Sequence, residues 1–328
     1  MLFTSLYEEE YEESMDLTTI IVNYNTANLL DKCISALRDA TQTISNEVLI
    51  VDNASKDESV SLLKQDFSDC KLIFNDENIG FGRANNQCVP FISGRYVLLL
   101  NTDAFVSEET IEKTIEYMDA HESCGILGVK LLGREGELQP SCRYFPTIWN
   151  IFLRSTGLDR FFKANQAIDN MAWAHDEARQ CDWVPGCYYL IRRELVEKIG
   201  LFDPRYFLYY EEVDHCFAAK KAGWEVHFYP HTSVVHIGGE SAKSVGSLTS
   251  GRQLDVLQTE SELLYFGKNH GRAVVFCHVL LITLSDMINV AKKAIKFKGK
   301  AILFGYVKHS YLVWSLYFKT RFATIPTR

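Results

Sequence analysis

The chain has 328 residues, of which 47% are hydrophobic and 23% charged, which is typical of a soluble globular protein with a sizeable core. Its net charge of −8 lacks the basic footprint of a nucleic-acid binder, so we expect no nucleic-acid partner. Nine scattered cysteines without a CxxC pair are typical of reduced thiols and disfavour a disulfide framework or a zinc site.

The N-terminal part of the chain alternates short apolar runs with helical patterns. After an acidic segment without the features of a signal peptide, we expect strands at 18–23, 47–52, 71–74 and 95–101. Helices are expected between them, at 28–40, 59–66 and 82–93. This alternation predicts βαβ units and a mostly parallel sheet, and therefore an α/β fold.

Polar side chains end each of these predicted strands. They are Asn23, Asp52, Asn75 and the run from Asn101 to Asp103. In an open parallel sheet, ligands bind outside the carboxyl ends of the strands, so this convergence indicates a binding site. The alternative is that each Asx residue only caps the helix that follows.

Three further features carry chemistry. Asp103 follows an apolar strand on a turn, where a carboxylate can hold a hard divalent cation. Gly80 and Gly82 permit close backbone approach, and Arg83 can meet a phosphate, although the segment does not match the GxGxxG fingerprint of dinucleotide-binding proteins. His236 ends an apolar strand before a Gly-Gly turn and is either a metal ligand or a core histidine.

A helix expected over 211–222 begins with several acids. Glu211 and Asp214 share one face of this helix, and Glu212 points elsewhere. Paired carboxylates at a helix start suit raised pKa values and general-base catalysis. The alternative is that acids simply favour a helix N-terminus.

Taken together, these residues resemble glycosyltransferase family 2, and within it the bacterial rhamnosyltransferase-like branch. The resemblance covers about 17–245 and rests on eight motifs in order: Ile20–Asn25, Val51–Asp57, Asn78–Asn86, Leu100–Asp103, Pro185–Cys187, Gly200–Asp203, Phe207–Asp214, and His236 with Ser241.

This resemblance implies a GT-A fold and an inverting, metal-dependent glycosyltransferase. The nucleotide-sugar contacts it implies are Asn23, Tyr24, Asn25, Asp52, Asn78, Gly80, Arg83, Asn86, Asn101 and Thr102. Asp103 and His236 would hold Mn²⁺ or Mg²⁺, and Gly186 and Cys187 would lie beside the sugar and the acceptor.

Two positions depart from the family pattern. Asn101 stands where the metal-binding DxD motif begins with Asp, which leaves one charge fewer on the metal. Glu212 falls at the position of the catalytic base, where the family usually has Asp. Because its side chain is one methylene longer, Glu211 or Asp214 could share or take the role.

The resemblance also implies the substrates. The expected donor is dTDP-rhamnose, with a UDP-hexose or UDP-N-acetylhexosamine as the alternative. The expected acceptor is a saccharide, polyprenyl-diphosphate-linked, in the assembly of a cell-surface polysaccharide such as O-antigen. A nucleotidyltransferase is disfavoured because Asn25–Asn28 is not a Gly-rich, Lys-bearing loop, and a degenerate sugar-nucleotide-binding protein remains the non-enzyme alternative.

We expect three regions: an acidic flexible tail over 1–15, a GT-A domain over 16–265, and a basic C-terminal helical region over 266–328. The apolar run 273–284 is shorter than the roughly 20 residues that span a bilayer. With the neighbouring lysines it predicts amphipathic helices on the cytoplasmic face of the bacterial inner membrane. Packing on the catalytic domain or a homodimer contact is the alternative.

Overall fold

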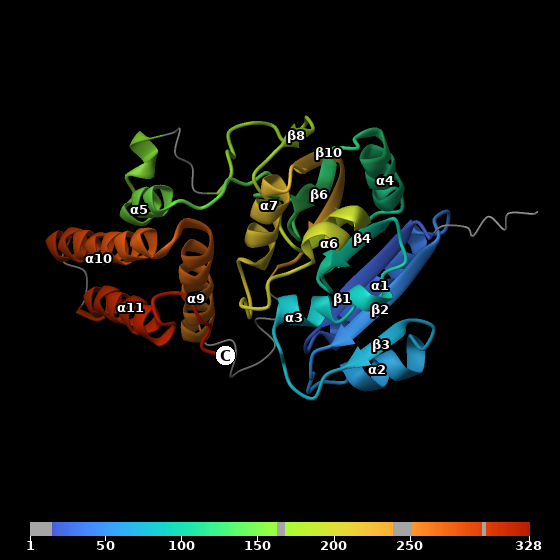
Figure 1. Ribbon diagram of the computed structural model, residues 1–328, viewed down its shortest axis with the longest axis horizontal. Coiled ribbons are helices and arrows are strands. Elements are labelled where there is room, and N and C mark those ends of the chain that lie inside the picture. The colour runs from blue at the N-terminus through green and yellow to red at the C-terminus, as the bar shows by residue number, and fades with distance from the viewer. Residues whose placement is uncertain (1–14, 163–167, 239–250, 297–299) are drawn as a thin grey trace, which may run out of the picture.

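The computed structural model describes residues 15–162, 168–238, 251–296 and 300–328. The predicted tail therefore lies almost entirely outside the described residues, as does Ser241. Two regions are visible in Figure 1: a sheet with helices on both faces, and a group of helices beside it.

The first half of the sheet is parallel. Its strands, in the spatial order β3-β2-β1-β4, are β3 (Lys71–Phe74), β2 (Asn46–Asp52), β1 (Leu17–Asn23) and β4 (Tyr96–Leu100). The helices that connect them are α1 (Ala27–Ala40), α2 (Ser59–Asp66) and α3 (Phe81–Asn86). The strands and the first two helices agree with the sequence-based expectation to within one residue at each end.

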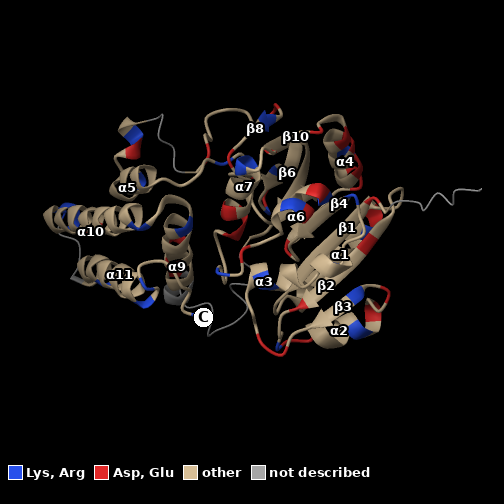
Figure 2. Cartoon of the chain, viewed as in Figure 1, with Lys and Arg blue, Asp and Glu red and all other residues tan. Residues whose placement is uncertain are grey.

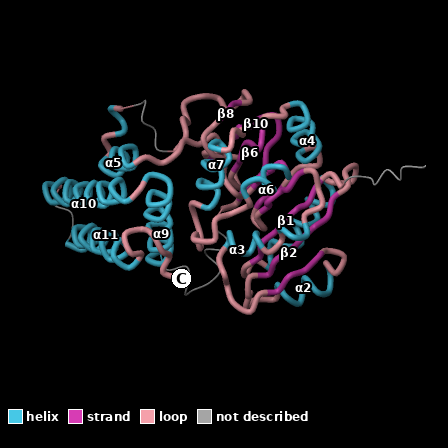
Figure 3. The backbone as a smooth tube through the Cα atoms, viewed as in Figure 1, coloured by secondary structure: helices cyan, strands magenta, loops and turns pink. Residues whose placement is uncertain are grey.

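Beyond β4 the sheet is mixed, where a mostly parallel sheet was expected. Antiparallel β9 (Tyr188–Arg192) lies between β4 and β6 (Cys124–Leu132), and β10 (Glu225–His236) then pairs with β6 in parallel. Three short strands pair antiparallel to these: β5 (Ala104–Phe105) and β8 (Arg179–Gln180) with β10, and β7 (Leu138–Gln139) with β6. Figure 3 shows the strands as one continuous layer.

Both faces of the sheet are buried, which explains the uninterrupted apolar runs in the sequence. Along β4, Leu98 and Leu100 join one hydrophobic cluster, and Val97 and Leu99 join the cluster on the opposite face. Helices α1, α2 and α4 (Thr110–Ala120) cover the first face. Helices α3, α6 (Arg193–Ile199) and α7 (Glu211–Lys221) cover the second.

The helix expected over 82–93 is shorter than predicted. Helix α3 ends at Asn86, and a separate 3-10 turn, η1 (Val89–Phe91), follows it. Pro90 is the physical reason, because proline has no backbone N–H to donate and its ring disfavours helical geometry in the residue before it.

The group of helices beside the sheet consists of α5 (Ile148–Thr156), α9 (Gly251–His270), α10 (Arg272–Ile295) and α11 (Lys300–Lys319), with the 3-10 turn η2 (Asp159–Phe161) after α5. Leu263, Phe266, Val279 and Leu316 belong to its own hydrophobic cluster. The predicted boundary between 265 and 266 falls inside α9, and the division into domains stays a prediction.

The apolar run over 273–284 is part of a longer helix than the sequence analysis considered. Helix α10 has 24 residues and is, among the described residues, the one helix long and apolar enough to cross a membrane. It continues past the apolar run because its polar residues have partners: buried Asp286 accepts hydrogen bonds from His309 and Ser310 of α11.

Candidate active site

A pocket of about 410 Å³ opens at the carboxyl ends of β1 and β4. This is the edge of the sheet where parallel strands present ligand-binding residues. The segments 185–187 and 207–212 line the pocket as well, and Leu257 of α9 brings the C-terminal helices into contact with it.

Most of the residues predicted from the sequence lie together in this pocket. Those that line it are Tyr24, Asn78, Gly80, Asn101, Thr102, Asp103, Gly186, Cys187, Glu211, Glu212 and His236. Those that do not line it are Asn23, Asn25, Asp52, Arg83, Asn86 and Asp214.

Asn23 and Asp52 lie behind the pocket wall and fix the strand ends. The Asn23 side-chain amide donates to Asp52 Oδ1 over 2.8 Å, and the backbone N–H of Ser55 donates to Asp52 Oδ2 over 3.0 Å. Asn25 Oδ1 accepts from the backbone N–H of Lys56. Asn23 and Asp52 are almost fully buried, and Asn25 has 7% of its surface exposed. Their hydrogen bonds therefore hold the backbone that positions the neighbouring Tyr24.

Arg83 and Asn86 brace the loop that follows α6. Arg83 Nε donates to the carbonyl of Pro204 over 2.7 Å, and its Nη2 donates to the backbone oxygen of Arg328 over 3.0 Å. Asn86 both donates to and accepts from the backbone of Phe202. These contacts turn Arg83 away from the pocket, although the sequence predicted it as a phosphate contact.

The backbone conformation and the close packing at position 80 require glycine. Its φ of 92° lies in the left-handed region, and a Cβ there would come within 2.5 Å of the Phe207 carbonyl oxygen. Asn78 Oδ1 accepts hydrogen bonds from the Gly80 N–H and from the side chain of Asn53, which also lines the pocket. The sequence analysis did not single out Asn53 as a site residue.

Asp103 and His236 lie side by side although they are far apart in the sequence. His236 Nε2 is 3.6 Å from Asp103 Oδ1. Gln139 fixes the imidazole: its amide donates to the His236 carbonyl, so its oxygen faces Nδ1 over 2.9 Å and accepts from it. The Nε2 lone pair therefore points toward the carboxylate, which is an arrangement of two donors suited to a cation.

Burial lowers the pKa of His236 although the Asp103 charge opposes that shift. The neutral imidazole is the form that binds metals. Within the described residues no group of three or more His, Cys, Asp and Glu side chains gathers around a common point. A metal here would therefore complete its shell with substrate oxygens and water, as Mg²⁺ commonly does.

Glu211 and Glu212 begin α7 at the bottom of the pocket. The chain reaches them through Tyr209 and Tyr210, both in left-handed geometry. The Oε2 atoms of both glutamates are buried and have no hydrogen-bond partner among the described residues. Burial raises the pKa of both carboxyls, and the Glu212 charge raises that of Glu211 further. A carboxyl in this condition is suited to accept a proton.

Arg143 also lines the pocket and was missed by the sequence analysis. Its positive charge lowers the pKa of Glu212, although burial outweighs it, so the two groups lie within electrostatic reach. The residue belongs to the segment between β7 and α5, where neither a recognised spacing nor a strand end marked it as functional. Phe81, Phe207 and Tyr209 also line the pocket; they lie inside motifs that the sequence analysis named but were not singled out there.

Asp214, the third predicted carboxylate, is held in an ion-pair network. It accepts hydrogen bonds from Lys268 and Asn269 of α9, and Lys268 also pairs with Asp203 over 2.7 Å. Burial alone would raise the pKa of Asp203, but the hydrogen bonds from Lys268 and Arg205 lower it. The network ties α7 to the C-terminal helices.

We expect Lys268→Met to destabilise the protein by about 2 to 3 kcal/mol, because it leaves the buried Asp214 carboxylate without its cation. The free energy of unfolding in urea, measured at pH 7, tests this. Lys319→Met is the matched control, since Lys319 is exposed and makes no ion pair with another residue in the described part of the chain. An equal loss in both variants would contradict the network's role.

Comparison with known proteins places this chain in a family. Residues 18–200 match the family model described as glycosyl transferase family 2. The chain is 25% identical over 234 residues to the N-acetylglucosaminyl-diphospho-decaprenol L-rhamnosyltransferase of Mycobacterium tuberculosis, covering 67% of this chain and 75% of that protein. It is 23% identical over 176 residues to the rhamnosyltransferase WbbL of Escherichia coli, covering 50% and 63%.

Among solved structures, the mannosyltransferase PcManGT from Pyrobaculum calidifontis in complex with GDP-Man and Mn²⁺ superposes with a TM-score of 0.54. The alignment covers 94% of this chain and 87% of that chain at 13% sequence identity. At this identity the likeness shows the fold, and it confirms the expected GT-A class.

Proposed function

The chain belongs to glycosyl transferase family 2 and is a glycosyltransferase that uses a sugar-nucleotide donor, and we propose that it is an inverting, metal-dependent enzyme. The observation that carries the proposal is the convergence in one pocket of the Asp103–His236 pair and the Glu212 carboxyl. The Asp103–His236 pair would hold a cation that stabilises the leaving diphosphate, and the Glu212 carboxyl would serve as the base that activates the acceptor hydroxyl.

We propose that Asp103 and His236 hold Mn²⁺ or Mg²⁺. The donor set fits, since a carboxylate oxygen and an imidazole lone pair face each other at 3.6 Å. When bound, the ion would neutralise the charge that develops on the diphosphate of the donor. A structural neighbour solved in complex with Mn²⁺ supports the use of a divalent ion.

In the proposed reaction Glu212 takes the proton of the acceptor hydroxyl. The acceptor oxygen forms a bond to the anomeric carbon as the bond from that carbon to the diphosphate oxygen breaks, and the nucleoside diphosphate leaves with the electron pair. One displacement inverts the anomeric configuration. Glu212 lies opposite Gly186, whose missing side chain leaves room there: a Cβ on Gly186 would be 3.9 Å from the Glu212 Cβ.

The donor's nucleoside would lie against Tyr24, Asn53 and Asn78, which line the pocket near the ends of β1 and β2. Asp52 and Asn23 would support this wall from behind through their hydrogen bonds. We propose dTDP-rhamnose as the donor, on the strength of the rhamnosyltransferases among the relatives. A UDP-hexose or UDP-N-acetylhexosamine is the alternative, supported by a poly(ribitol-phosphate) β-glucosyltransferase among them.

Donor hydrolysis is the simplest test of this function. In the absence of acceptor, we expect slow release of nucleoside diphosphate with Mn²⁺ present, and loss of that release when EDTA removes the ion. Tight nucleotide binding without any metal-dependent hydrolysis or transfer would instead indicate a degenerate binding protein.

The C-terminal helices present apolar stripes to solvent. On α10 the residues Phe276, Leu280, Leu284 and Met287 recur every three or four positions, and each is at least 45% exposed. On α11 the same is true of Phe304, Val307, Tyr311 and Phe318, with one longer interval. Figure 2 shows these two helices as largely uncharged, with basic residues toward their ends.

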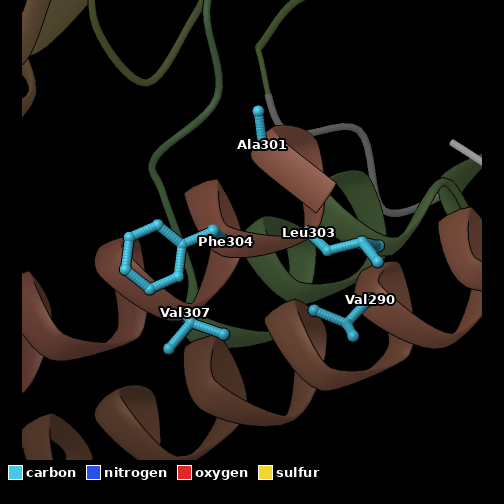
Figure 4. Close-up of a pocket in the computed structure, with 5 residues that line it drawn as sticks. All are labelled: Val290, Ala301, Leu303, Phe304 and Val307. Carbon is cyan, nitrogen blue, oxygen red and sulfur yellow. The ribbon is translucent and has the colours of Figure 1, made fainter. Parts of the chain in front are cut away.

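An apolar groove of about 480 Å³ lies between α10 and α11. It is lined by Val290, Ala301, Leu303, Phe304 and Val307, and Figure 4 shows their side chains gathered between the two helices. The Lys308 ammonium lies 4.6 Å from the centre of the Phe304 ring, and Lys292 and Lys296 lie at the end of α10. Apolar side chains flanked by lysines are complementary to an anionic lipid surface. We propose that this face docks on the cytoplasmic side of the membrane, where a polyprenyl-diphosphate-linked saccharide would be the acceptor.

We expect Met287→Glu and Tyr311→Glu to weaken binding to vesicles that contain anionic lipid by about tenfold each, because each places a charge on the inserted face. Vesicle flotation measures the bound fraction. Met171→Glu is the matched control, since Met171 is 45% exposed on a loop outside these helices. Binding unchanged by the helix variants would count against the membrane proposal and favour packing against a second copy of the chain.

A further inference from the structure

The ionisable Asp, Glu, Lys and Arg side chains that line the pocket are acidic, with one exception. Asp103, Glu211 and Glu212 all line it, and among its described lining residues Arg143 is the one Lys or Arg side chain. A nucleoside diphosphate brings several negative charges into this environment. Even with a divalent ion at Asp103 and His236, such a ligand needs a further positive partner. Arg83, which the sequence predicted for this purpose, is bound to Pro204 instead.

The Arg143 side chain is held in place by contacts that do not involve its Nη1 and Nη2 atoms. Its Nε donates to the carbonyl of Pro140 over 3.0 Å, and its guanidinium stacks on the Trp183 ring with 4.6 Å between the guanidinium carbon and the ring centroid. Its backbone is bridged to Trp183 as well. No described residue accepts a hydrogen bond from Nη1 or Nη2, so these donors remain available to a ligand.

Arg143 also lies within electrostatic reach of both chemical groups of the site. Its charge lowers the pKa of Glu212, and its side chain lines the same pocket as Asp103 and His236. A guanidinium stays charged in such surroundings and matches two phosphate oxygens with its planar fork.

Building on the proposed function, we propose that Arg143 is a catalytic residue that binds the diphosphate leaving group through its Nη atoms. It stabilises the charge that builds on the diphosphate as the bond to the sugar breaks, and it adds a charge on the protein that neither the metal nor Glu212 supplies. Its fixed position means that little side-chain entropy is lost when the donor binds.

Calorimetric titration of the full chain with UDP and dTDP in the presence of Mn²⁺ tests the assignment, with UMP and dTMP titrated in parallel. We expect Arg143→Gln to weaken diphosphate binding by about 10- to 100-fold and monophosphate binding by less. Arg143→Lys keeps the charge but loses the planar fork, so its affinity for the diphosphates should fall between those of the wild-type protein and Arg143→Gln. Arg179→Gln is the matched control, because Arg179 stacks on Trp173 at 3.8 Å but does not line the pocket.

A second readout separates contact with the diphosphate from a structural role. Arg143→Gln should lower kcat at saturating donor, and Arg143→Lys should recover part of that loss at an unchanged melting temperature. The assignment is overturned if Arg143→Gln binds UDP and dTDP as the wild-type protein does, or if both variants weaken mono- and diphosphates equally. If the wild-type chain binds neither diphosphate, the proposed function fails together with this inference.

Discussion

Glu212→Gln is expected to lower kcat by about 10³-fold while leaving donor binding within about twofold of the wild-type value. The amide keeps the shape of the side chain, but it cannot accept the proton of the acceptor hydroxyl. Turnover of a sugar nucleotide with a saccharide acceptor gives kcat, and calorimetry gives donor affinity. Glu109→Gln on α4 is a control for the same substitution at an exposed surface position.

Glu211→Gln distinguishes the two neighbouring carboxyls. If Glu212 alone is the base, Glu211→Gln should retain most of the turnover, whereas equal losses would mean that the pair shares the role. The pH profile gives an independent readout. Because burial raises the pKa of Glu212, its base form predominates only above that raised value, so kcat/KM of the wild-type enzyme should fall as the pH drops through it. Wild-type turnover by Glu212→Gln would rule out the assignment.

Asp103→Asn is expected to weaken Mn²⁺ binding by about 100-fold and to lower turnover at fixed Mn²⁺ by about 10²- to 10³-fold. The reason is that Asn101 is already neutral, so in the proposed site Asp103 would supply the carboxylate charge to an ion held between it and His236. Electron paramagnetic resonance of free Mn²⁺ measures the binding directly, without reference to activity.

Asn101→Asp is the complementary variant. It restores the first acid of the DxD pattern on the same turn, and we expect tighter Mn²⁺ binding as a result. If Asp103→Asn and Asn101→Asp both leave Mn²⁺ binding at the wild-type level, the ion is not held at this turn.

The sequence predicted the parallel half of the sheet well because its signals are local. Strands β1, β2 and β4 are largely apolar runs that become buried on both faces, whereas the edge strand β3 is partly exposed. Each of the four ends in, or is directly followed by, a polar residue at the edge where the pocket lies. The antiparallel insertion of β9 between β4 and β6 was not predictable in this way. That pairing joins segments far apart in the chain and depends on both faces of β9 being covered, which no local pattern records.

The site residues were predictable where a chemically suitable side chain lies inside a recognised sequence motif. Asp103 and His236 were paired through the resemblance to a family, and the structure places them together, although their role as metal ligands stays a prediction. Two other positions needed the structure. Arg143 reaches the pocket through the folding of an irregular segment onto Trp183, and Asp214 differs from Glu212 only because Lys268 approaches it from another helix.

The most direct test of the central claim is a panel of nucleotide-sugars, including dTDP-rhamnose, UDP-glucose, UDP-galactose and UDP-N-acetylglucosamine, each with Mn²⁺ or with EDTA. Release of free nucleoside diphosphate is measured for the wild-type chain and for Asp103→Asn. The account predicts one donor, dTDP-rhamnose, that is turned over with Mn²⁺, is not turned over with EDTA, and is turned over poorly by the variant. Release that is unaffected by EDTA, or no release and no nucleotide binding with any donor, would contradict it.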